Sequence, residues 1–214
     1  MNGRLITLEG GEGAGKSTVL AAVRAQLANS GIDVVVTREP GGTPVGEAIR
    51  AVLLDPQRAG SLCAETELLL IFASRAQLVR EVVQPALAAG RWVLSDRFTD
   101  ASFAYQGGGR AQPDARIAEL ELWAAAGLKP DLTLLLDLPV DAGLARARDR
   151  GPADRMELEG IEFFERVRAA YRARAASEPA RFRVIDASAA LADVLAQVER
   201  TVGVFLASCG RSAA

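Results

Sequence analysis

The sequence predicts an α/β protein in which a five-stranded parallel sheet is flanked by helices. First, short apolar runs alternate along the chain with stretches of helical periodicity, which is the order expected of βαβ units. Second, these runs are almost continuously hydrophobic rather than alternating, as is typical of strands buried on both faces. Third, a glycine-rich segment follows the first run directly, where such folds bind phosphate.

The strand pattern occurs five times along the chain. The segments are residues 4–10, 33–39, 91–97, 131–138 and 182–187. Helical periodicity separates them, beginning with Val19, Val23 and Leu27 on one face. Two further apolar stripes in the last third of the chain are expected to be core: Phe163, Phe164, Val167 and Tyr171 in the first, and Leu191, Val194, Leu195, Val198, Val202 and Phe205 in the second.

The length and the absence of linkers indicate one domain over residues 1–214. A chain of this size is ordinary for a single α/β core. No internal repeat, low-complexity tract or Pro/Ser-rich linker divides it. Residues 151–160 are polar, charged and bounded by glycines, and we expect a mobile excursion there rather than a domain boundary.

The composition of the chain indicates which kinds of partner the protein can bind. The formal net charge of −2 argues against a surface that binds nucleic acid through positive charge. No apolar run approaches the ~18 residues of a membrane helix. Cys63 and Cys209 stand apart, so neither a zinc site nor a disulfide framework is indicated. We therefore expect a cytoplasmic protein that binds small molecules, with no nucleic-acid or membrane partner.

The segment after the first strand fits the phosphate-binding pattern G-x-x-x-x-G-K-[ST]. In such a turn, backbone N–H groups wrap a phosphate and the following helix dipole favours its charge. Lys16 would reach the β- and γ-phosphates of a nucleoside triphosphate, and Ser17 would bind Mg²⁺, so a triphosphate and Mg²⁺ are the predicted ligands. The predicted triphosphate-binding loop comprises Gly10, Gly11, Glu12, Gly13, Ala14, Gly15, Lys16, Ser17 and Thr18.

Two charged residues end the third predicted strand, where open α/β folds bind ligands. Asp96 can hold a metal ion through water, and Arg97 can bind phosphate with two hydrogen bonds. An isolated pair of this kind would more often be a helix cap and a surface cation. The phosphate loop in the same chain favours the functional interpretation.

Arginines cluster in residues 146–160, at Arg146, Arg148, Arg150 and Arg155. Such a run is usually a solvated face. Phosphoryl transfer, however, spreads negative charge over the moving group, and arginines on a closing lid can stabilise that charge. The chain has no histidine, which is no obstacle because transfer to an ionised phosphate needs no general base of that kind.

Five segments along the chain follow one another in a recognisable order. They are EGGEGAGKST, TREPGGT, FASRAQ, DRFTDASFAYQGGGR and RARDRGPADRME. In this order and spacing the chain resembles thymidylate kinases of the bacterial type over nearly its whole length, and TREPGGT and the DRF segment are the most specific part. The resemblance implies the P-loop nucleoside monophosphate kinase fold, a homodimer, and Mg²⁺-dependent phosphoryl transfer from ATP to dTMP, which gives dTDP and ADP for dTTP synthesis.

The resemblance implies roles on the phosphate side of the acceptor. Arg38 and Arg97 would hold the dTMP phosphate, and Asp96 would serve the magnesium ion. Glu12 would lie near the 3′-hydroxyl of the deoxyribose. Because Gly13 stands where eukaryotic-type enzymes carry an arginine, the catalytic arginine would come from a lid at about residues 146–160. The lid candidates are Arg148, Arg150 and Arg155, while Arg146 and the turn after the last strand would enclose adenine.

The resemblance also implies the contacts of the base and sugar. Phe72 would stack on thymine and Arg75 would bond its O4 edge, although Phe72 could also be ordinary core. Ser102 would contact the N3 edge, and Tyr105 would lie against C2′, where its ring would exclude ribose. Gln106 is a neighbouring pocket residue without an individual role.

Two other functions share parts of this pattern. A kinase of another small acceptor, such as UMP, CMP or shikimate, would differ in what binds beside Phe72, Arg75 and Tyr105. A nucleotide-dependent switch or regulatory ATPase would hydrolyse ATP without an acceptor, but the N-K-x-D motif of guanine switches is absent because lysine occurs only at Lys16 and Lys129. A purely structural or nucleic-acid-binding role would leave the phosphate loop unused.

Overall fold

The computed structural model describes residues 3–149 and 151–211, and its five strands form one sheet in the order β2-β3-β1-β4-β5. All four strand pairings are parallel. Each strand lies within two residues of its predicted segment, so the predicted sheet is confirmed. The strands are β1 (Leu5–Gly10), β2 (Val34–Arg38), β3 (Trp92–Asp96), β4 (Leu132–Asp137) and β5 (Phe182–Asp186).

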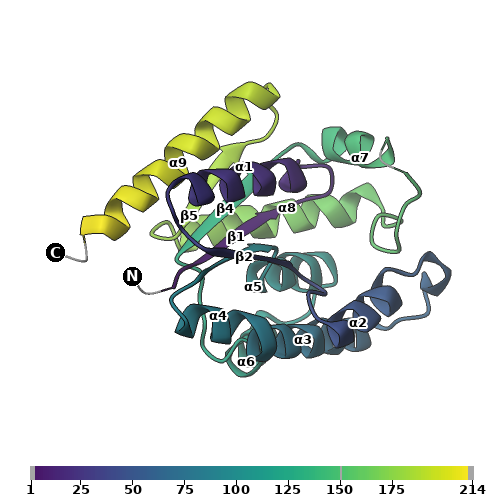
Figure 1. Ribbon diagram of the computed structural model, residues 1–214. Coiled ribbons are helices and arrows are strands. Elements are labelled where there is room, and N and C mark those ends of the chain that lie inside the picture. Colours follow the sequence, from purple (N-terminus) through teal and green to yellow (C-terminus); the bar gives the residue numbers. More distant parts are fainter. Residues whose placement is uncertain (1–2, 150, 212–214) are drawn as a thin grey trace.

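Helices cover both faces of this sheet, as Figure 1 shows, with α1 and α9 on one face and α5 and α8 on the other. Helices α3, α4 and α6 lie together in the lower part of this view, and α3 and α4 pack in one cluster with Leu5 of β1 and Val93 of β3. The helices are α1 (Lys16–Asn29), α2 (Pro44–Leu54), α3 (Ala64–Leu78), α4 (Gln84–Ala88), α5 (Thr99–Ser102), α6 (Asp114–Ala124), α7 (Val140–Arg148), α8 (Ile161–Ser177) and α9 (Leu191–Arg211). The short η1 (Pro56–Arg58) and the π-helical η2 (Val79–Val83) and η3 (Phe103–Gly109) complete the set.

The near-continuous hydrophobicity of the strands reflects burial on both faces. In β1, Ile6 and Leu8 pack with Val23 of α1 and Val198 of α9, whereas Leu5, on the opposite face of the strand, packs with a separate cluster beneath α3 and α4. The stripe on α8 is buried as expected. On α9, Val194, Val198 and Val202 are core and Phe205 packs against them. Leu195 is only partly buried and Leu191 is exposed, so the predicted stripe is wrong at these two positions.

The two tryptophans lie in opposite environments. Trp92 of β3 is 3% exposed and contacts Phe205 of α9 edge-on, with the ring centroids 5.8 Å apart. Trp123 of α6 is 73% exposed. Among the described residues, no helix combines the length and the apolar character needed to cross a bilayer.

The sheet brings the chemistry-bearing segments to one edge. The phosphate loop follows β1, while Asp96 ends the neighbouring strand β3 and Arg97 comes directly after it. Arg38 ends β2, which is paired with β3 through the register Arg38 to Asp96. Segments separated by more than 80 residues in sequence therefore meet at the carboxyl ends of adjacent strands, where ligands bind in this class of fold.

Candidate active site

The phosphate loop connects β1 to α1 through glycines in the left-handed region. Gly13 has φ +68° and Gly15 has φ +88°, and such angles strain any residue with a Cβ. At Gly13 a Cβ would also lie 2.0 Å from the carbonyl oxygen of Gly143 in α7. Only glycine therefore fits at position 13, where the loop lies directly against α7.

Lys16 begins α1 and folds back over the loop. Its Nζ donates to the carbonyl oxygens of Gly10 and Gly11, at 3.1 and 3.0 Å. Burial lowers the pKa of Lys16 to about 8 and repulsion from Arg97 adds to the effect, while Glu12 and Asp96 oppose it. Since a bound polyphosphate would favour the charged amine, this position suits a phosphate ligand.

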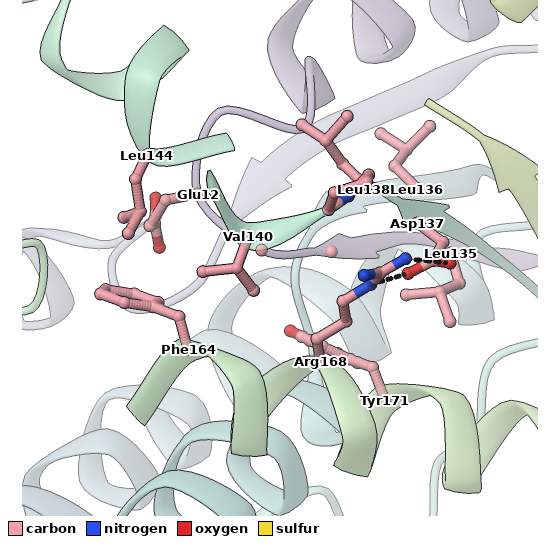
Figure 2. A pocket seen from close by; sticks show the side chains of 13 residues that line it. Glu12, Leu135, Leu136, Asp137, Leu138, Val140, Leu144, Phe164, Arg168 and Tyr171 are labelled. Carbon is pink, nitrogen blue, oxygen red and sulfur yellow. Dashed lines mark hydrogen bonds and ion pairs between the residues drawn. The ribbon is translucent and has the colours of Figure 1, made fainter. Parts of the chain in front are cut away.

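A small cavity lies behind the loop, between β4, α7 and α8 (Figure 2). Apolar side chains such as Val140, Leu144 and Phe164 form much of its wall. The carboxylate of Asp137, at the end of β4, accepts two hydrogen bonds from Arg168, at 2.8 and 3.1 Å. Asp137 is thus neutralised by a partner and is a poor candidate for a metal ligand.

Asp96 is in a different situation at the end of β3. Its Oδ1 is buried and has no hydrogen-bond partner among the described residues. Asp96 and Ser17 line one cavity, together with Thr37 and Arg38. One carboxylate and one hydroxyl suit Mg²⁺, which retains waters and binds substrate phosphates. Within the described parts of the chain, no cluster of three or more His, Cys, Asp or Glu side chains offers a complete metal cage.

Arg97 is held in a left-handed conformation, with φ +70°. Its N–H donates to the Leu8 carbonyl at 2.9 Å, and its own carbonyl accepts from the Ser95 hydroxyl at 2.6 Å. The guanidinium donates to Glu12 Oε1 at 2.8 Å and to the Tyr171 hydroxyl at 3.1 Å. A non-glycine residue in this region costs about 1–3 kcal/mol, so the surroundings hold Arg97 in place against a backbone preference.

Glu9 is a buried contributor that sequence analysis did not assign to the site. Its Oε1 accepts from the Phe98 N–H and its Oε2 from the Tyr171 hydroxyl, both at 2.8 Å. Burial raises the pKa of Glu9 to about 8, Asp100 adds to the rise, and Arg97 opposes it. The sequence feature that could have identified Glu9 as a site residue is a lone acidic residue inside an apolar strand.

A second cavity opens beside Arg97 and forms the candidate acceptor pocket. It contains six of the eight residues predicted for dTMP. These are Glu12, Arg75, Arg97, Ser102, Tyr105 and Gln106. Tyr105 donates to Glu12 Oε1 at 2.7 Å, and the Arg97 guanidinium lies over the Tyr105 ring at 4.6 Å. The acceptor pocket therefore shares Glu12 and Arg97 with the surroundings of the phosphate loop.

Arg75 of α3 is 1% exposed, and its neighbours fix the position of its guanidinium. Nε donates to Glu39 Oε2 at 2.7 Å, Nη1 to Ser102 Oγ at 3.0 Å, and Nη2 to the Phe98 carbonyl at 3.1 Å. Nη2 also forms an ion pair with Glu39 Oε2 at 2.6 Å. Because a guanidinium has five donors, one N–H of Nη1 has no hydrogen-bond partner in the part of the chain that the structure describes.

Phe72 does not lie where stacking on a base would require it. It is 2% exposed and packs in the core with Leu68, Phe103 and Ile117. Ile71 lines the acceptor pocket instead. Positions three and four residues before Arg75 both lie near its helix face, and tertiary packing assigns the aromatic ring to the core. The stacking role predicted for Phe72 is thus not supported by its position.

The positions of Arg38 and Arg50 differ from those that the sequence predicted. Arg38 pairs with Glu47 at 2.9 Å and lines the cavity of Ser17 and Asp96, not the acceptor pocket. Arg50, which sequence analysis left without a role, lines the acceptor pocket and donates to the Pro40 carbonyl at 2.9 Å. The sequence feature that could have identified Arg50 as a site residue is its place on the helix that follows the Pro-Gly-Gly turn.

The three described arginines of residues 146–160 lie in different surroundings. Arg146 donates to the carbonyl of Ala187, just after β5, at 3.1 Å, so it does meet the turn predicted to enclose adenine. Arg148 is exposed. Arg155 is 4% exposed and bound to Glu67 at 2.7 Å on the wall of the acceptor pocket. Arg150 lies outside the described residues.

Three features define the class of protein: the parallel sheet, the glycine loop after β1, and an acceptor cavity that shares residues with the surroundings of that loop. Together they are those of a P-loop nucleoside monophosphate kinase, which is a phosphotransferase. The sequence profile described as Thymidylate kinase matches residues 8–198. The chain belongs to the thymidylate kinase family.

Individual relatives agree with this assignment. Thymidylate kinase of Pseudomonas syringae pv. tomato is 56% identical over 200 residues, which cover 94% of this chain and 95% of that protein. Thymidylate kinase of Chromobacterium violaceum is 54% identical over 196 residues, 92% of each chain. A crystal structure of thymidylate kinase from Ehrlichia chaffeensis is similar with a TM-score of 0.75 at 28% identity, covering 94% of this chain and 99% of that one.

Proposed function

We propose that the protein transfers the γ-phosphoryl group of ATP to dTMP and releases dTDP and ADP. The observation that carries this proposal is the position of Arg97. Its guanidinium lines the acceptor pocket and at the same time binds Glu12 of the phosphate loop at 2.8 Å. A phosphate held by Arg97 would therefore lie next to the phosphates held by the loop, as direct transfer between two nucleotides requires.

On the donor side, backbone N–H groups of the loop and Lys16 would bind the ATP phosphates. The contact between Arg146 and Ala187 supports an adenine site beside β5. Ser17 and Asp96 would hold Mg²⁺, which when bound would neutralise part of the phosphate charge. The fit of Mg²⁺ to this position is supported by Asp96 Oδ1, which is buried without a hydrogen-bond partner among the described residues, beside the cavity that Ser17 and Asp96 line.

On the acceptor side, the remaining N–H of Arg75 would donate to O4 of thymine beside Ser102. Tyr105 would lie against C2′ of the sugar and disfavour ribose. Arg97 and Arg50 would bind the dTMP phosphate, since both line the pocket. A phosphate oxygen of dTMP is already ionised, so it can attack the γ-phosphorus without a general base.

We propose that residues 146–160 act as a lid within a single domain of residues 1–214. Positive charge supplied by the lid would stabilise the transferred group. Arg148 is the described candidate for this role because it is exposed near the end of α7. Arg155 is not proposed for it, since Glu67 and the Leu53 carbonyl already bind its guanidinium.

We also propose a homodimer and a cytoplasmic location, where ATP is available as donor. Helices α3 and α6 expose Leu69, Leu122 and Trp123, at 59, 70 and 73%. Exposed apolar residues that gather on neighbouring helices favour an interface, and a second copy of this chain is the proposed occupant. Light scattering coupled to gel filtration should give twice the chain mass, and Trp123→Glu should reduce it to one chain.

The proposed reaction is tested by ATP consumption with Mg²⁺ and one acceptor at a time: dTMP, dUMP, UMP, CMP, AMP, GMP or none. We expect strong preference for dTMP, with dTDP formed in step with ADP. Preference for another monophosphate would contradict the acceptor assignment. ATP loss that does not depend on an acceptor would indicate a hydrolase or switch instead.

A further inference from the structure

A buried carboxylate stands behind the acceptor pocket. Glu67 of α3 is 1% exposed and does not line the pocket itself. It accepts hydrogen bonds from Gln106, Arg110 and Arg155. Gln106 and Arg155 do line the pocket. Glu67 can therefore influence a bound nucleotide only through these partners.

Glu67 determines which end of the Gln106 amide points toward it. Gln106 Nε2 donates to Glu67 Oε1 at 3.0 Å. Burial raises the pKa of Glu67, but the hydrogen bonds from Gln106, Arg110 and Arg155 outweigh it and hold the pKa below its usual value. Near neutral pH the carboxylate is ionised and only accepts hydrogen bonds, so the amide must present its NH₂ to it.

The carbonyl end of the same amide is then left for the pocket. Gln106 Oε1 accepts no hydrogen bond within the described residues. It is nevertheless not fully buried, because it is absent from the set of buried polar atoms without a partner. Ser102 and Gln106 are one helical turn apart and line the pocket together with Arg75. The wall thus offers a donor from Arg75 and an acceptor from Gln106.

This pair of groups distinguishes pyrimidines by their hydrogen-bonding edges. Thymine has an O4 acceptor beside an N3–H donor. Cytosine has the reverse, an amino donor at C4 beside an unprotonated N3. A fixed guanidinium donor and a fixed carbonyl acceptor on the wall of one pocket therefore complement thymine and oppose both groups of cytosine.

We propose that Glu67 is a positioning residue for base selection: it holds the Gln106 amide with its carbonyl toward the base, so that the pocket selects an O4/N3–H edge over the edge of cytosine. This inference rests on the proposed function and extends it. Arg155 joins the same carboxylate to residues 151–160, and its backbone N–H donates to the Leu54 carbonyl at 3.0 Å. Base selection and the placement of this segment are thus linked through one side chain.

The test is Glu67→Gln, with the dissociation constants of dTMP and dCMP measured by calorimetry. Arg155 Nη2, at 2.7 Å from Glu67 Oε2, would bind the single carbonyl of the new amide. The NH₂ would then face Gln106, whose amide would turn over and place its own NH₂ against thymine N3–H. We expect dTMP binding to weaken roughly 10- to 100-fold with dCMP binding unchanged or tighter, and kcat at saturating dTMP to change less than about threefold.

Two matched variants separate positioning from a structural role. Arg110→Gln removes another partner of Glu67 but keeps the bond to Gln106, so the ratio of dTMP to dCMP affinity should stay within about twofold of the wild-type ratio. Gln106→Leu should weaken dTMP binding in the wild-type protein and add little to Glu67→Gln. Equal weakening of dTMP and dCMP by Glu67→Gln, or losses that multiply in the double variant, would overturn the inference.

If Glu67→Gln does not fold, a measurement on the wild-type protein tests the orientation of the Gln106 amide instead. In ¹⁵N spectra, the side-chain NH₂ of Gln106, identified by its absence in Gln106→Leu, should exchange slowly with solvent and shift little when dTMP saturates the protein. Rapid exchange, or a large shift on binding, would overturn the inference. Absence of dTMP phosphorylation would refute the proposed function separately, because these binding readouts need no turnover.

Discussion

The donor and acceptor sides of the site are constructed in different ways. The donor side is one continuous segment whose shape comes from its backbone, with glycines at positive φ and a close approach to α7. The acceptor pocket is assembled from side chains of distant segments that hold one another through buried hydrogen bonds. The first kind of site leaves a short motif in the sequence. The second depends on the direction in which each side chain points.

The difference should also appear in how substitutions act. Arg75–Glu39 and Arg155–Glu67 are ion pairs in which every side chain is less than 5% exposed. Removing one member of such a pair leaves an uncompensated buried charge. On the donor side, the Lys16 amine hydrogen-bonds within the described residues only to two backbone carbonyls. We therefore expect removal of a donor-side side chain such as Lys16 to lower activity without lowering stability, and acceptor-side substitutions to lower both.

Lys16→Ala should have the largest effect on activity. Removing the amine that would neutralise the transferred charge is expected to lower kcat about 10³-fold. The melting temperature should change by less than about 2 °C, because only two exchangeable hydrogen bonds are lost. Steady-state kinetics and a thermal melt check both parts, and wild-type turnover in this variant would remove Lys16 from the mechanism.

Arg75→Met should have the largest effect on stability. It leaves Glu39 buried without its cation, and the free energy of unfolding should fall by about 3 kcal/mol, with dTMP binding lost as well. Arg38→Met is the matched control because the Arg38–Glu47 pair is about half exposed, where such pairs contribute about 1 kcal/mol or less. Urea unfolding compares the two, and equal losses would contradict the distinction between buried and exposed pairs.

Gly13→Ala tests the backbone-built side. A Cβ at this φ, placed 2.0 Å from the Gly143 carbonyl, should cost about 2 kcal/mol of unfolding free energy and displace α7. Gly11→Ala is the control, since a Cβ there meets nothing within 4 Å. Denaturant titration of both variants is the measurement. A fully stable Gly13→Ala protein would show that the loop can move away from α7.

The smallest expected effect is a pH dependence of ATP binding. With the pKa of Lys16 at about 8 in the free protein, the amine loses its proton above that pH and must regain it to bind phosphate. ATP affinity should therefore fall by up to about tenfold per pH unit above 8. Calorimetry in two buffers of different ionisation enthalpy should show proton uptake near pH 9, and its absence would place the pKa higher.

The strands and the phosphate loop could be predicted from the sequence because each leaves a local pattern in it. The five strands are continuous apolar runs, and burial on both faces leaves that pattern whatever their neighbours are. The phosphate loop requires glycine at specific positions. Phe72 shows the limit of the method, since it and Ile71 are both near the face of Arg75, and only packing against Phe103 and Ile117 decides which of them reaches the pocket.

The arginines show the same limit on a larger scale. Charge in the sequence indicates an anionic ligand but not the partner of each cation. Arg155 was a candidate for the transferred phosphoryl group, and the structure places it on Glu67, which lies 88 residues away in the sequence. Arg38 pairs with Glu47 outside the acceptor pocket, whereas Arg50 lines it. Such pairings depend on long-range contacts that no local pattern records.

The contrast between the two tryptophans gives the protein two separate fluorescent reporters. Trp92, packed against Phe205 beneath α9, should emit at short wavelength and resist quenching by acrylamide until the sheet unfolds. Trp123, at 73% exposure on α6, should emit as a solvated indole and be quenched at once in a free chain. Spectra recorded across a dilution series and a urea series would therefore distinguish dissociation of two copies from unfolding of one.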